Sequence, residues 1–156
     1  MRKLLTTVAR QLDRSLQRPV SLVGPGGERR GTEDLGRQGE QLAQRWLRLE
    51  GGCKILYRNF KAPDGGEVDI VCRHEDILVF AEVKTRTSEL FGRPATAVTP
   101  DKRKLIIRGA REWLRLLDKP RTPFRFDIIE ILLFEGSAPD INWLQGAFQL
   151  SHPFLE

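Results

Sequence analysis

Apolar side chains recur at the three- and four-residue spacing of an amphipathic helix in two long stretches of the chain. The first stretch begins at Thr32, which the sequence predicts as the helix N-cap, and ends at Gly51-Gly52. The second begins at Thr99-Pro100, with threonine at the cap and proline in the first turn, and ends before Pro120. Shorter apolar runs at 53–60, 67–73, 77–85 and 124–134 have the length and composition of strands. The pattern therefore predicts two helices and four strands.

The connections between these strands determine much of the predicted sheet. The turns at 61–66 and 74–76 are so short that the first three strands must pair antiparallel. A helix separates the third strand from the fourth, and a crossover of this kind makes the two strands parallel. Apolar residues such as Trp143 and Phe148 predict a short strand or helix that covers one end of the sheet. The predicted fold class is α/β, with a mixed central sheet of an antiparallel three-strand meander plus a parallel crossover strand, flanked by helices.

The first 31 residues differ from the rest of the chain. Residues 1–18 carry leucines at helical spacing with arginines between them, which fits a short amphipathic helix or a basic tail without fixed structure. Residues 24–27, Gly-Pro-Gly-Gly, are typical of a flexible linker. We therefore expect an N-terminal basic extension and flexible linker at 1–31, one domain at 32–150 and a C-terminal tail at 151–156.

Composition narrows the class of protein without identifying a ligand. The chain of 156 residues has a formal net charge of +5, which favours encounters with polyanions but does not by itself indicate nucleic acid. Cys53 and Cys72 lie in strand-like runs without zinc-site spacing, which predicts reduced core thiols in a cytoplasmic protein. No run approaches the ~20 apolar residues that span a bilayer, so we expect no membrane segment.

Charged residues share one face of two neighbouring predicted strands. Side-chain alternation places Glu67 with Asp69 on one strand, and Glu82 with Lys84 on the next. Carboxylates are ligands that Mg²⁺ uses, usually one or two of them together with water and substrate oxygens. This pattern indicates a site in which Asp69, Glu82 and the Val83 carbonyl bind a metal, and Lys84 stabilises charge that develops on a phosphate. A cross-strand ion pair between Lys84 and either carboxylate is the alternative.

A further acid and a set of basic residues flank these strands. Glu40 lies at the border of the apolar stripe of the first helix, where its carboxylate either reaches over the sheet edge toward the site or stays on the surface. In the first case Glu40 can complete the metal's outer shell or bind a second ion. Basic residues beside the site and on the second helix are candidates for contacts with a nucleic-acid backbone, or else form a solvated helix face. They are Arg86, Lys102, Arg103, Lys104, Arg108 and Arg111.

Five short motifs in a fixed order resemble the YraN-type family of bacterial proteins. They are Gly39-Glu40, Arg58-Asn59-Phe60, Gly66-Glu67-Val68-Asp69-Ile70, the run from Val79 to Arg86, and Arg125-Phe126-Asp127. The resemblance covers about residues 32–148 and implies a restriction-endonuclease-like PD-(D/E)xK core, similar in architecture to archaeal Holliday junction resolvases.

This resemblance also implies roles for particular residues. Asp69, Glu82 and Lys84 match the acid, acid and lysine positions of the nuclease core, and Glu40 matches the helix glutamate. Val68 stands where the proline of the motif's name would be. For Asp127 we expect a structural pairing, with Arg125 or an arginine of a loop, in place of catalysis.

The activity implied by the resemblance is a Mg²⁺- or Mn²⁺-dependent DNA endonuclease of the bacterial cytoplasm. Its substrate would be branched or otherwise structured DNA in recombination or repair, and analogy with resolvases suggests a homodimer. Two other interpretations stay open: a non-cleaving nucleic-acid-binding accessory module that retains the nuclease fold, and a scaffold domain in which the carboxylates and Lys84 are only structural.

Overall fold

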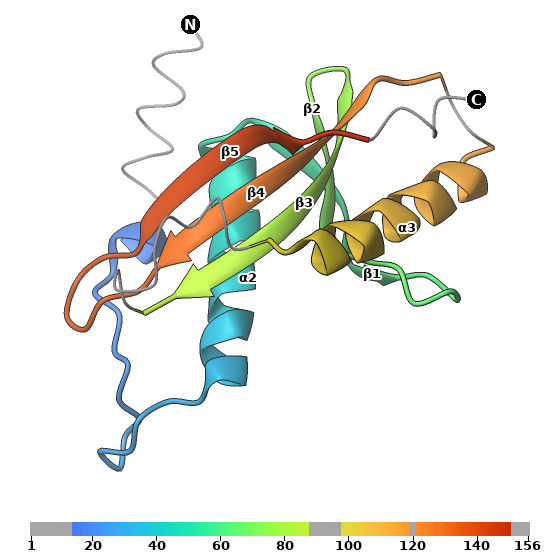
Figure 1. Ribbon diagram of the computed structural model, residues 1–156. Coiled ribbons are helices and arrows are strands. Elements are labelled where there is room, and N and C mark those ends of the chain that lie inside the picture. The colour runs from blue at the N-terminus through green and yellow to red at the C-terminus, as the bar shows by residue number, and fades with distance from the viewer. Residues whose placement is uncertain (1–13, 88–97, 119–120, 151–156) are drawn as a thin grey trace, which may run out of the picture.

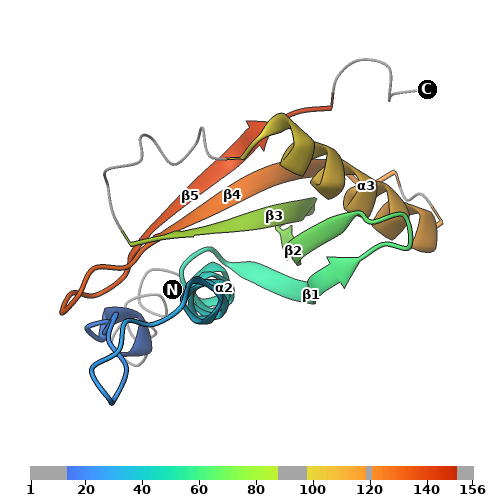
Figure 2. The same cartoon turned by 60° about the horizontal axis from the view of Figure 1, so that its bottom comes forward.

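The computed structural model describes residues 14–87, 98–118 and 121–150, which form a five-stranded sheet with one helix on each face (Figure 1; Figure 2). Helix α2 (Thr32–Leu49) lies on one face and helix α3 (Pro100–Leu116) on the other. The strands are β1 (Cys53–Lys61), β2 (Glu67–His74), β3 (Ile77–Arg86), β4 (Phe124–Leu132) and β5 (Asp140–Phe148). A single 3₁₀ turn, η1 (Arg14–Gln17), precedes them. Residues 1–13 of the predicted N-terminal helix lie outside the described residues.

The sheet has the predicted mixed topology, with strand order β1-β2-β3-β4-β5. Strands β1, β2 and β3 form the antiparallel meander, and β4 pairs parallel to β3 from Leu78↔Phe124 to Arg86↔Leu132. The C-terminal apolar residues form an edge strand, β5, antiparallel to β4. Of the two alternatives for this segment, the strand is therefore confirmed, and it extends the sheet sideways instead of covering its end.

The two helix starts differ in how they are capped. The prediction that Thr32 caps the first helix is wrong, because Gly31 occupies the cap position and no side chain accepts a hydrogen bond there. Helix α3 starts as predicted: the Thr99 hydroxyl accepts a hydrogen bond from the Lys102 N–H at 3.2 Å, with Pro100 at the first helical position. Within the described residues no helix is long and apolar enough to cross a membrane.

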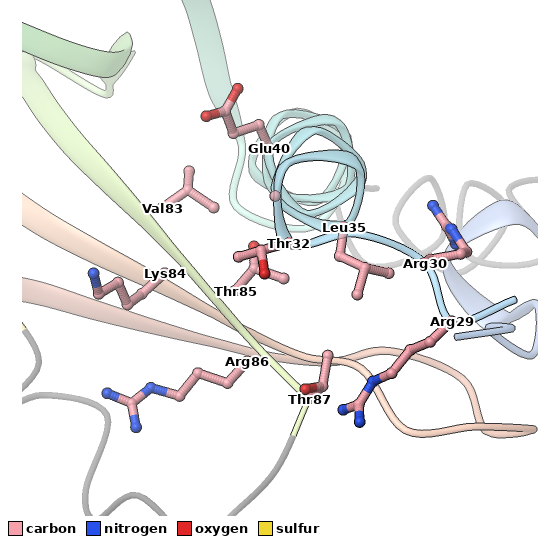
Figure 3. Close-up of a pocket in the computed structure, with 11 residues that line it drawn as sticks. Arg29, Arg30, Thr32, Leu35, Glu40, Val83, Lys84, Thr85, Arg86 and Thr87 are labelled. Atoms are coloured by element: carbon pink, nitrogen blue, oxygen red, sulfur yellow. The ribbon is translucent and has the colours of Figure 1, made fainter. Parts of the chain in front are cut away.

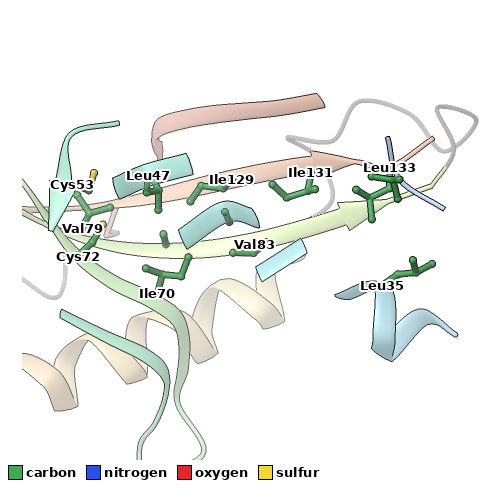
Figure 4. Packing of buried hydrophobic residues seen from close by; sticks show 13 residues of the cluster. Leu35, Leu47, Cys53, Ile70, Cys72, Val79, Val83, Ile129, Ile131 and Leu133 are labelled. Atoms are coloured by element: carbon green, nitrogen blue, oxygen red, sulfur yellow. The ribbon is translucent and has the colours of Figure 1, made fainter. Parts of the chain in front are cut away.

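Two apolar clusters lie on opposite faces of the sheet. The cluster under α2 includes Leu47, Val79 and Ile129, together with the buried free thiols of Cys53 and Cys72 (Figure 4). The cluster under α3 includes the aromatic side chains of β3 and β4 and the buried residues of the helix, namely Phe80, Phe126, Ile106 and Ala110. Because side chains alternate along β3, Glu82 and Lys84 continue the face that α3 covers.

Part of the segment predicted as a linker packs on the domain. Val20 is buried and forms a parallel bridge with Glu135. Its N–H donates to the Ser137 carbonyl and its own carbonyl accepts from the Gly136 N–H, each at 2.8 Å. Close to α2, Arg30 donates to the Asp34 carboxylate at 2.7 Å. These contacts fix the path of the chain into α2.

Glycines allow both helices to lie very close to the strands that carry the candidate site. A Cβ atom on Gly39 of α2 would lie 1.8 Å from the Thr85 hydroxyl of β3. On the other face, a Cβ atom on Gly66, just before β2, would lie 2.4 Å from the backbone nitrogen of Gly109 in α3. Because only glycine fits such approaches, Gly39 sets the position of Glu40 over β3, and the Gly66–Gly109 contact sets the position of α3 over β2.

Candidate metal centre

The pairing of β2 with β3 ends at Ile70, so the first residues of β2 have no partner on β3, and the candidate site lies where the two strands part. Their pairing runs from His74↔Ile77 only to Ile70↔Ala81, whereas β1 follows β2 as far as Glu67. We call the region beyond Ile70 and Ala81 the fork. There the Val83 N–H donates to the Asp69 carboxylate at 2.9 Å instead of to a β2 carbonyl. Since the N–H and C=O of one strand residue point to the same sheet edge, the Val83 carbonyl also faces the fork.

The carboxyl groups of Asp69 and Glu82 interact across the fork. Glu82 is only 4% exposed. Burial, followed by the charge of Asp69, raises the pKa of Glu82 to about 8, and a side-chain hydrogen bond with Asp69 acts in the same direction. The charges of Lys102 and Lys84 act against this rise. Glu82 Oε2 is buried without a hydrogen-bond partner.

This donor set fits a hard divalent cation. A buried carboxylate oxygen without a partner is costly, and a proton or a cation placed between two carboxyl groups removes that cost. Mg²⁺ is usually held by one or two protein carboxylates and fills its other positions with water and substrate oxygens. Asp69, Glu82 and the Val83 carbonyl match that requirement. Among the residues that the structure describes, no three His, Cys, Asp or Glu side chains are arranged to hold an ion together, so Glu40 lies outside this inner set.

Glu40 approaches the pair from α2. Burial, and after it the charge of Asp69, raises the pKa of Glu40, while a hydrogen bond from Asn59 and the charge of Lys102 lower it. Figure 3 shows the Glu40 side chain leaving α2 on the side of Val83. Asn59 has a φ of +50° within β1, a conformation that asparagine adopts more readily than most residues. The only sign of Asn59 in the sequence was its place in the Arg58-Asn59-Phe60 motif, to which no role was attached.

A cleft of about 480 Å³ opens beside the fork, between α2 and the last residues of β3. Lys84 and Arg86 project to one side of β3, and Thr85 lies on the side of α2 (Figure 3). The cleft lining comprises Arg29, Arg30, Thr32, Leu35, Gly36, Glu40, Val83, Lys84, Thr85, Arg86 and Thr87. Glu40, Lys84 and Arg86 thus line one cleft, although Lys84 and Arg86 leave β3 on the face opposite α2. The structure adds Arg29, which the sequence placed in the linker and therefore gave no role.

Lys102 lies at the carboxylate cluster and not on the outer surface of α3. Its ammonium forms an ion pair with Glu67 and lies 3.6 Å from Glu82 Oε1. Burial disfavours its charge, but the hydrogen bond to Glu67 and the charge of Glu82 outweigh this and raise the pKa of Lys102. The sequence had grouped Lys102 with nucleic-acid contacts, because the helical wheel does not show how α3 sits on the sheet.

The other basic residues of α3 lie in different environments. The Arg103 guanidinium lies 5.4 Å from the centre of the Phe148 ring in β5. Lys104, Arg108 and Arg111 are exposed. None of these four residues lines the cleft, so Arg86 is the member of the predicted nucleic-acid-binding group that lies beside Lys84.

Asp127 has the structural role that the sequence predicted. It is fully buried in β4 and accepts hydrogen bonds from Arg125 Nε at 2.9 and 3.1 Å. Trp143 Nε1 donates to it at 2.8 Å and the Gly146 N–H at 3.0 Å, both from β5. These contacts join β4 to the edge strand.

Sequence comparisons identify relatives of this chain. A protein named UPF0102 protein from Solibacter usitatus is 43% identical over 121 residues, which cover 77% of this chain and 89% of that protein. A second UPF0102 protein, from Trichlorobacter lovleyi, is 40% identical over 124 residues, or 79% of this chain and 96% of the relative. The family profile described as uncharacterised protein family UPF0102 matches residues 39–131, which include Glu40, Asp69, Glu82 and Lys84. The chain therefore belongs to the UPF0102 family, the family of the YraN-type resemblance.

Proposed function

We propose that this protein is a Mg²⁺- or Mn²⁺-dependent DNA endonuclease that hydrolyses phosphodiester bonds. The observation that carries this proposal is the pair of adjacent carboxyl groups at the fork, with a buried Glu82 oxygen that lacks a partner and with Lys84 on the same strand. The resemblance to resolvases suggests branched or otherwise structured DNA of recombination or repair as the substrate.

Each site residue has a distinct task in this reaction. Asp69, Glu82 and the Val83 carbonyl would hold the ion, and Glu40 would stand in its outer shell. When bound, a divalent ion polarises the phosphate and lowers the pKa of water. Lys84 places a positive charge at the cleft, where it can stabilise negative charge that develops on the phosphate. Arg86 and Arg29 line the same cleft and can contact neighbouring phosphates.

The test begins with metal binding. Mn²⁺ and Mg²⁺ are titrated calorimetrically into the wild-type protein and Glu82→Ala, and binding is expected only in the wild type. Linear, single-stranded, flapped and four-way DNA are then screened for cleavage with each ion.

Two substitutions assign the cleavage to this site. Asp69→Asn and Lys84→Ala are each expected to reduce cleavage by roughly 10²-fold or more at unchanged folding. Asp76→Asn in an exposed turn and Lys54→Ala at an exposed position of β1 are matched controls that should keep wild-type cleavage. Cleavage that survives both site substitutions would rule out the assignment.

A second candidate function is a non-cleaving nucleic-acid-binding accessory module. The exposed side chains of Lys104, Arg108 and Arg111 on α3 favour it. Such a module would bind DNA without metal, and its affinity would fall steeply with salt because each neutralised phosphate releases counterions. Charge reversal at Arg108 and Arg111 should then weaken binding, and equal binding before and after reversal would exclude α3 as the contact surface.

The homodimer belongs to the same proposal, because it rests on the analogy with resolvases. Sedimentation of the protein alone and with four-way DNA measures the stoichiometry. A monomer in both samples would exclude this arrangement.

A further inference from the structure

Helix α3 carries a lysine into the carboxylate cluster on the face opposite α2. The Thr99 cap and Pro100 fix the first turn of α3, which contains Lys102. One and a half to two turns later, Gly109 packs against the backbone next to Gly66, at the start of β2. These two constraints hold the first turn of α3 over the fork, so the position of Lys102 follows from the packing of the whole helix.

Lys102 forms an ion pair with one of the candidate metal ligands, Glu82. Its ammonium pairs with Glu67 and lies 3.6 Å from Glu82 Oε1. The Glu82 side chain is only 5% exposed, and that of Lys102 is 25% exposed. Lys84 also affects Glu82, but through its charge and without an ion pair within 4 Å among the described residues. Without metal, the positive charge nearest to Glu82 therefore belongs to Lys102.

We propose that Lys102 is a positioning residue that holds Glu82 in the metal-free protein and competes with the divalent cation for that carboxylate. This inference rests on the proposed function, because it requires a metal at Asp69 and Glu82. A divalent ion that binds Glu82 meets the repulsion of a nearby ammonium, so the ammonium has to move away or lowers the affinity for the ion. Helix α3 thereby sets the metal affinity of the site.

Glu67 is the carboxylate with which the Lys102 ammonium stays paired when a metal ion displaces it from Glu82. The Lys102 ammonium already pairs with the Glu67 carboxylate, whose side chain is 37% exposed. A lysine ammonium on a flexible four-carbon stem can leave Glu82 while it keeps this partner. From the sequence we expected Glu67 to be only an accessory residue beside Asp69. Its pairing with Lys102 explains why an acid at that position is useful without being a metal ligand.

Competition between Lys102 and the metal ion for Glu82 can be distinguished by experiment from a purely structural ion pair. If Lys102 only stabilises the fold, its removal lowers stability and leaves metal affinity unchanged or weaker. If Lys102 competes with the cation, its removal strengthens metal binding, because four carboxyl groups then lose the positive charge of Lys102 that acts on them. These groups are Glu40, Glu67, Asp69 and Glu82.

The experiment is a calorimetric titration of Mn²⁺ into the full chain at about pH 8, where ordinary carboxyl groups are ionised and a large fraction of Glu82 is ionised as well. Lys102→Gln is expected to bind Mn²⁺ roughly five- to tenfold more tightly than the wild type. Lys102→Arg retains the charge and should stay within about twofold of the wild-type affinity. Lys104→Gln makes the same charge change two residues away, at an exposed position, and should also stay within about twofold.

Thermal unfolding gives a second readout that does not depend on cleavage. Lys102→Gln should melt below the wild type without metal, and saturating Mn²⁺ should raise its melting temperature more than that of the wild type. If Lys102→Gln does not fold, Lys102→Met keeps the apolar stem of the side chain and is judged by the same criterion.

If the folded Lys102 variant binds Mn²⁺ as tightly as the wild type or more weakly, this inference is overturned, whereas the proposed function is not affected. Mn²⁺ binding that Glu82→Ala does not reduce overturns both, because the ion then binds elsewhere. Tighter binding in Lys102→Gln with unchanged binding in Lys104→Gln supports the competition.

Discussion

Glu82 in β3 and Asp127 in β4 are among the buried carboxyl groups of the sheet, and their surroundings differ in kind. Asp127 receives hydrogen bonds from Arg125, Trp143 and the Gly146 backbone. Glu82 has a carboxyl group as its neighbour and one oxygen without a partner. Burial is nearly the same, at 0% and 4% exposure, so burial alone does not separate the two residues.

The difference indicates which acid serves the fold and which can serve a ligand. A buried carboxylate whose oxygens are all satisfied by the protein stabilises the native structure and has little capacity left for an ion. A buried carboxylate beside a second acid is destabilised until a proton or a cation joins the pair. Strongly perturbed carboxyl groups at a cleft are therefore candidates for function, and Glu82 meets this description while Asp127 does not.

The largest expected effect is on stability. Asp127→Ala leaves Arg125, whose side chain is 17% exposed, and two donors of β5 without their acceptor, and should cost roughly 3–5 kcal/mol in the free energy of unfolding. Glu82→Gln replaces a carboxyl group that keeps its proton below about pH 8 with a neutral amide of the same shape. It should change the free energy of unfolding of the metal-free protein near neutral pH by about 1 kcal/mol or less. Urea unfolding of both variants without metal measures these changes, and similar losses in the two would remove the distinction between the acids.

The second effect is the pH dependence of stability. The pKa of Glu82 is raised to about 8 from a model-peptide value of 4.5, so between these values the folded protein keeps a proton that the unfolded chain has lost. The free energy of unfolding should therefore fall as pH rises from about 4.5 to about 8, by a few kcal/mol and at most about 5 kcal/mol, and should change little from this source outside that range.

Glu82→Gln is the control for this pH effect. It lacks the titrating group and should show a flatter profile over the same range. Glu40, whose pKa is also raised, contributes a fall of the same sign in both proteins. Denaturant titrations at several pH values without metal measure the free energy of unfolding of both proteins. Parallel pH profiles for the two would show that Glu82 does not cause the pH dependence.

The smallest expected effect concerns Lys84. This lysine is partly exposed at the cleft, and Lys84→Ala should change the free energy of unfolding by about 1 kcal/mol or less. A much larger loss, together with absent Mn²⁺ binding, would place Lys84 with Asp127 among structural residues and would favour the scaffold interpretation. Unfolding in urea beside the Mn²⁺ titration gives both values.

Local rules predicted the strands of the site and most of its acids. Alternation along two adjacent strands placed Glu82 and Lys84 on one face and Asp69 beside them, and the short turns required antiparallel pairing. The structural role of Asp127 was also predicted, on its pattern with Arg125. The placement of these acids and the pairing of Asp127 both depend on residues that are close in sequence or lie on adjacent strands.

Residues that reach the site from distant segments were not predicted in their roles. Lys102 was listed with the candidate nucleic-acid contacts in the first turn of its helix, because a helical wheel describes one helix without the surface against which that helix packs. Arg29 was assigned to a linker, but it forms an antiparallel bridge with Val23, in a segment that a second bridge joins to the chain after β4, between Val20 and Glu135. Asn59 required the close approach of α2 that Gly39 permits.

The sequence by itself determined the mixed sheet, the order of its pairing up to β4 and the acidic face of β2 and β3, because periodicity, turn length and capping act over a few residues. The tertiary structure decided where β2 leaves β3, that the Asp69 carboxylate takes over the Val83 N–H there, and that Lys102 lies against Glu67 and Glu82. Those features depend on close contacts at Gly39, Gly66 and Gly109 between segments far apart in the chain. Packing of that kind leaves no periodic signal in a single sequence.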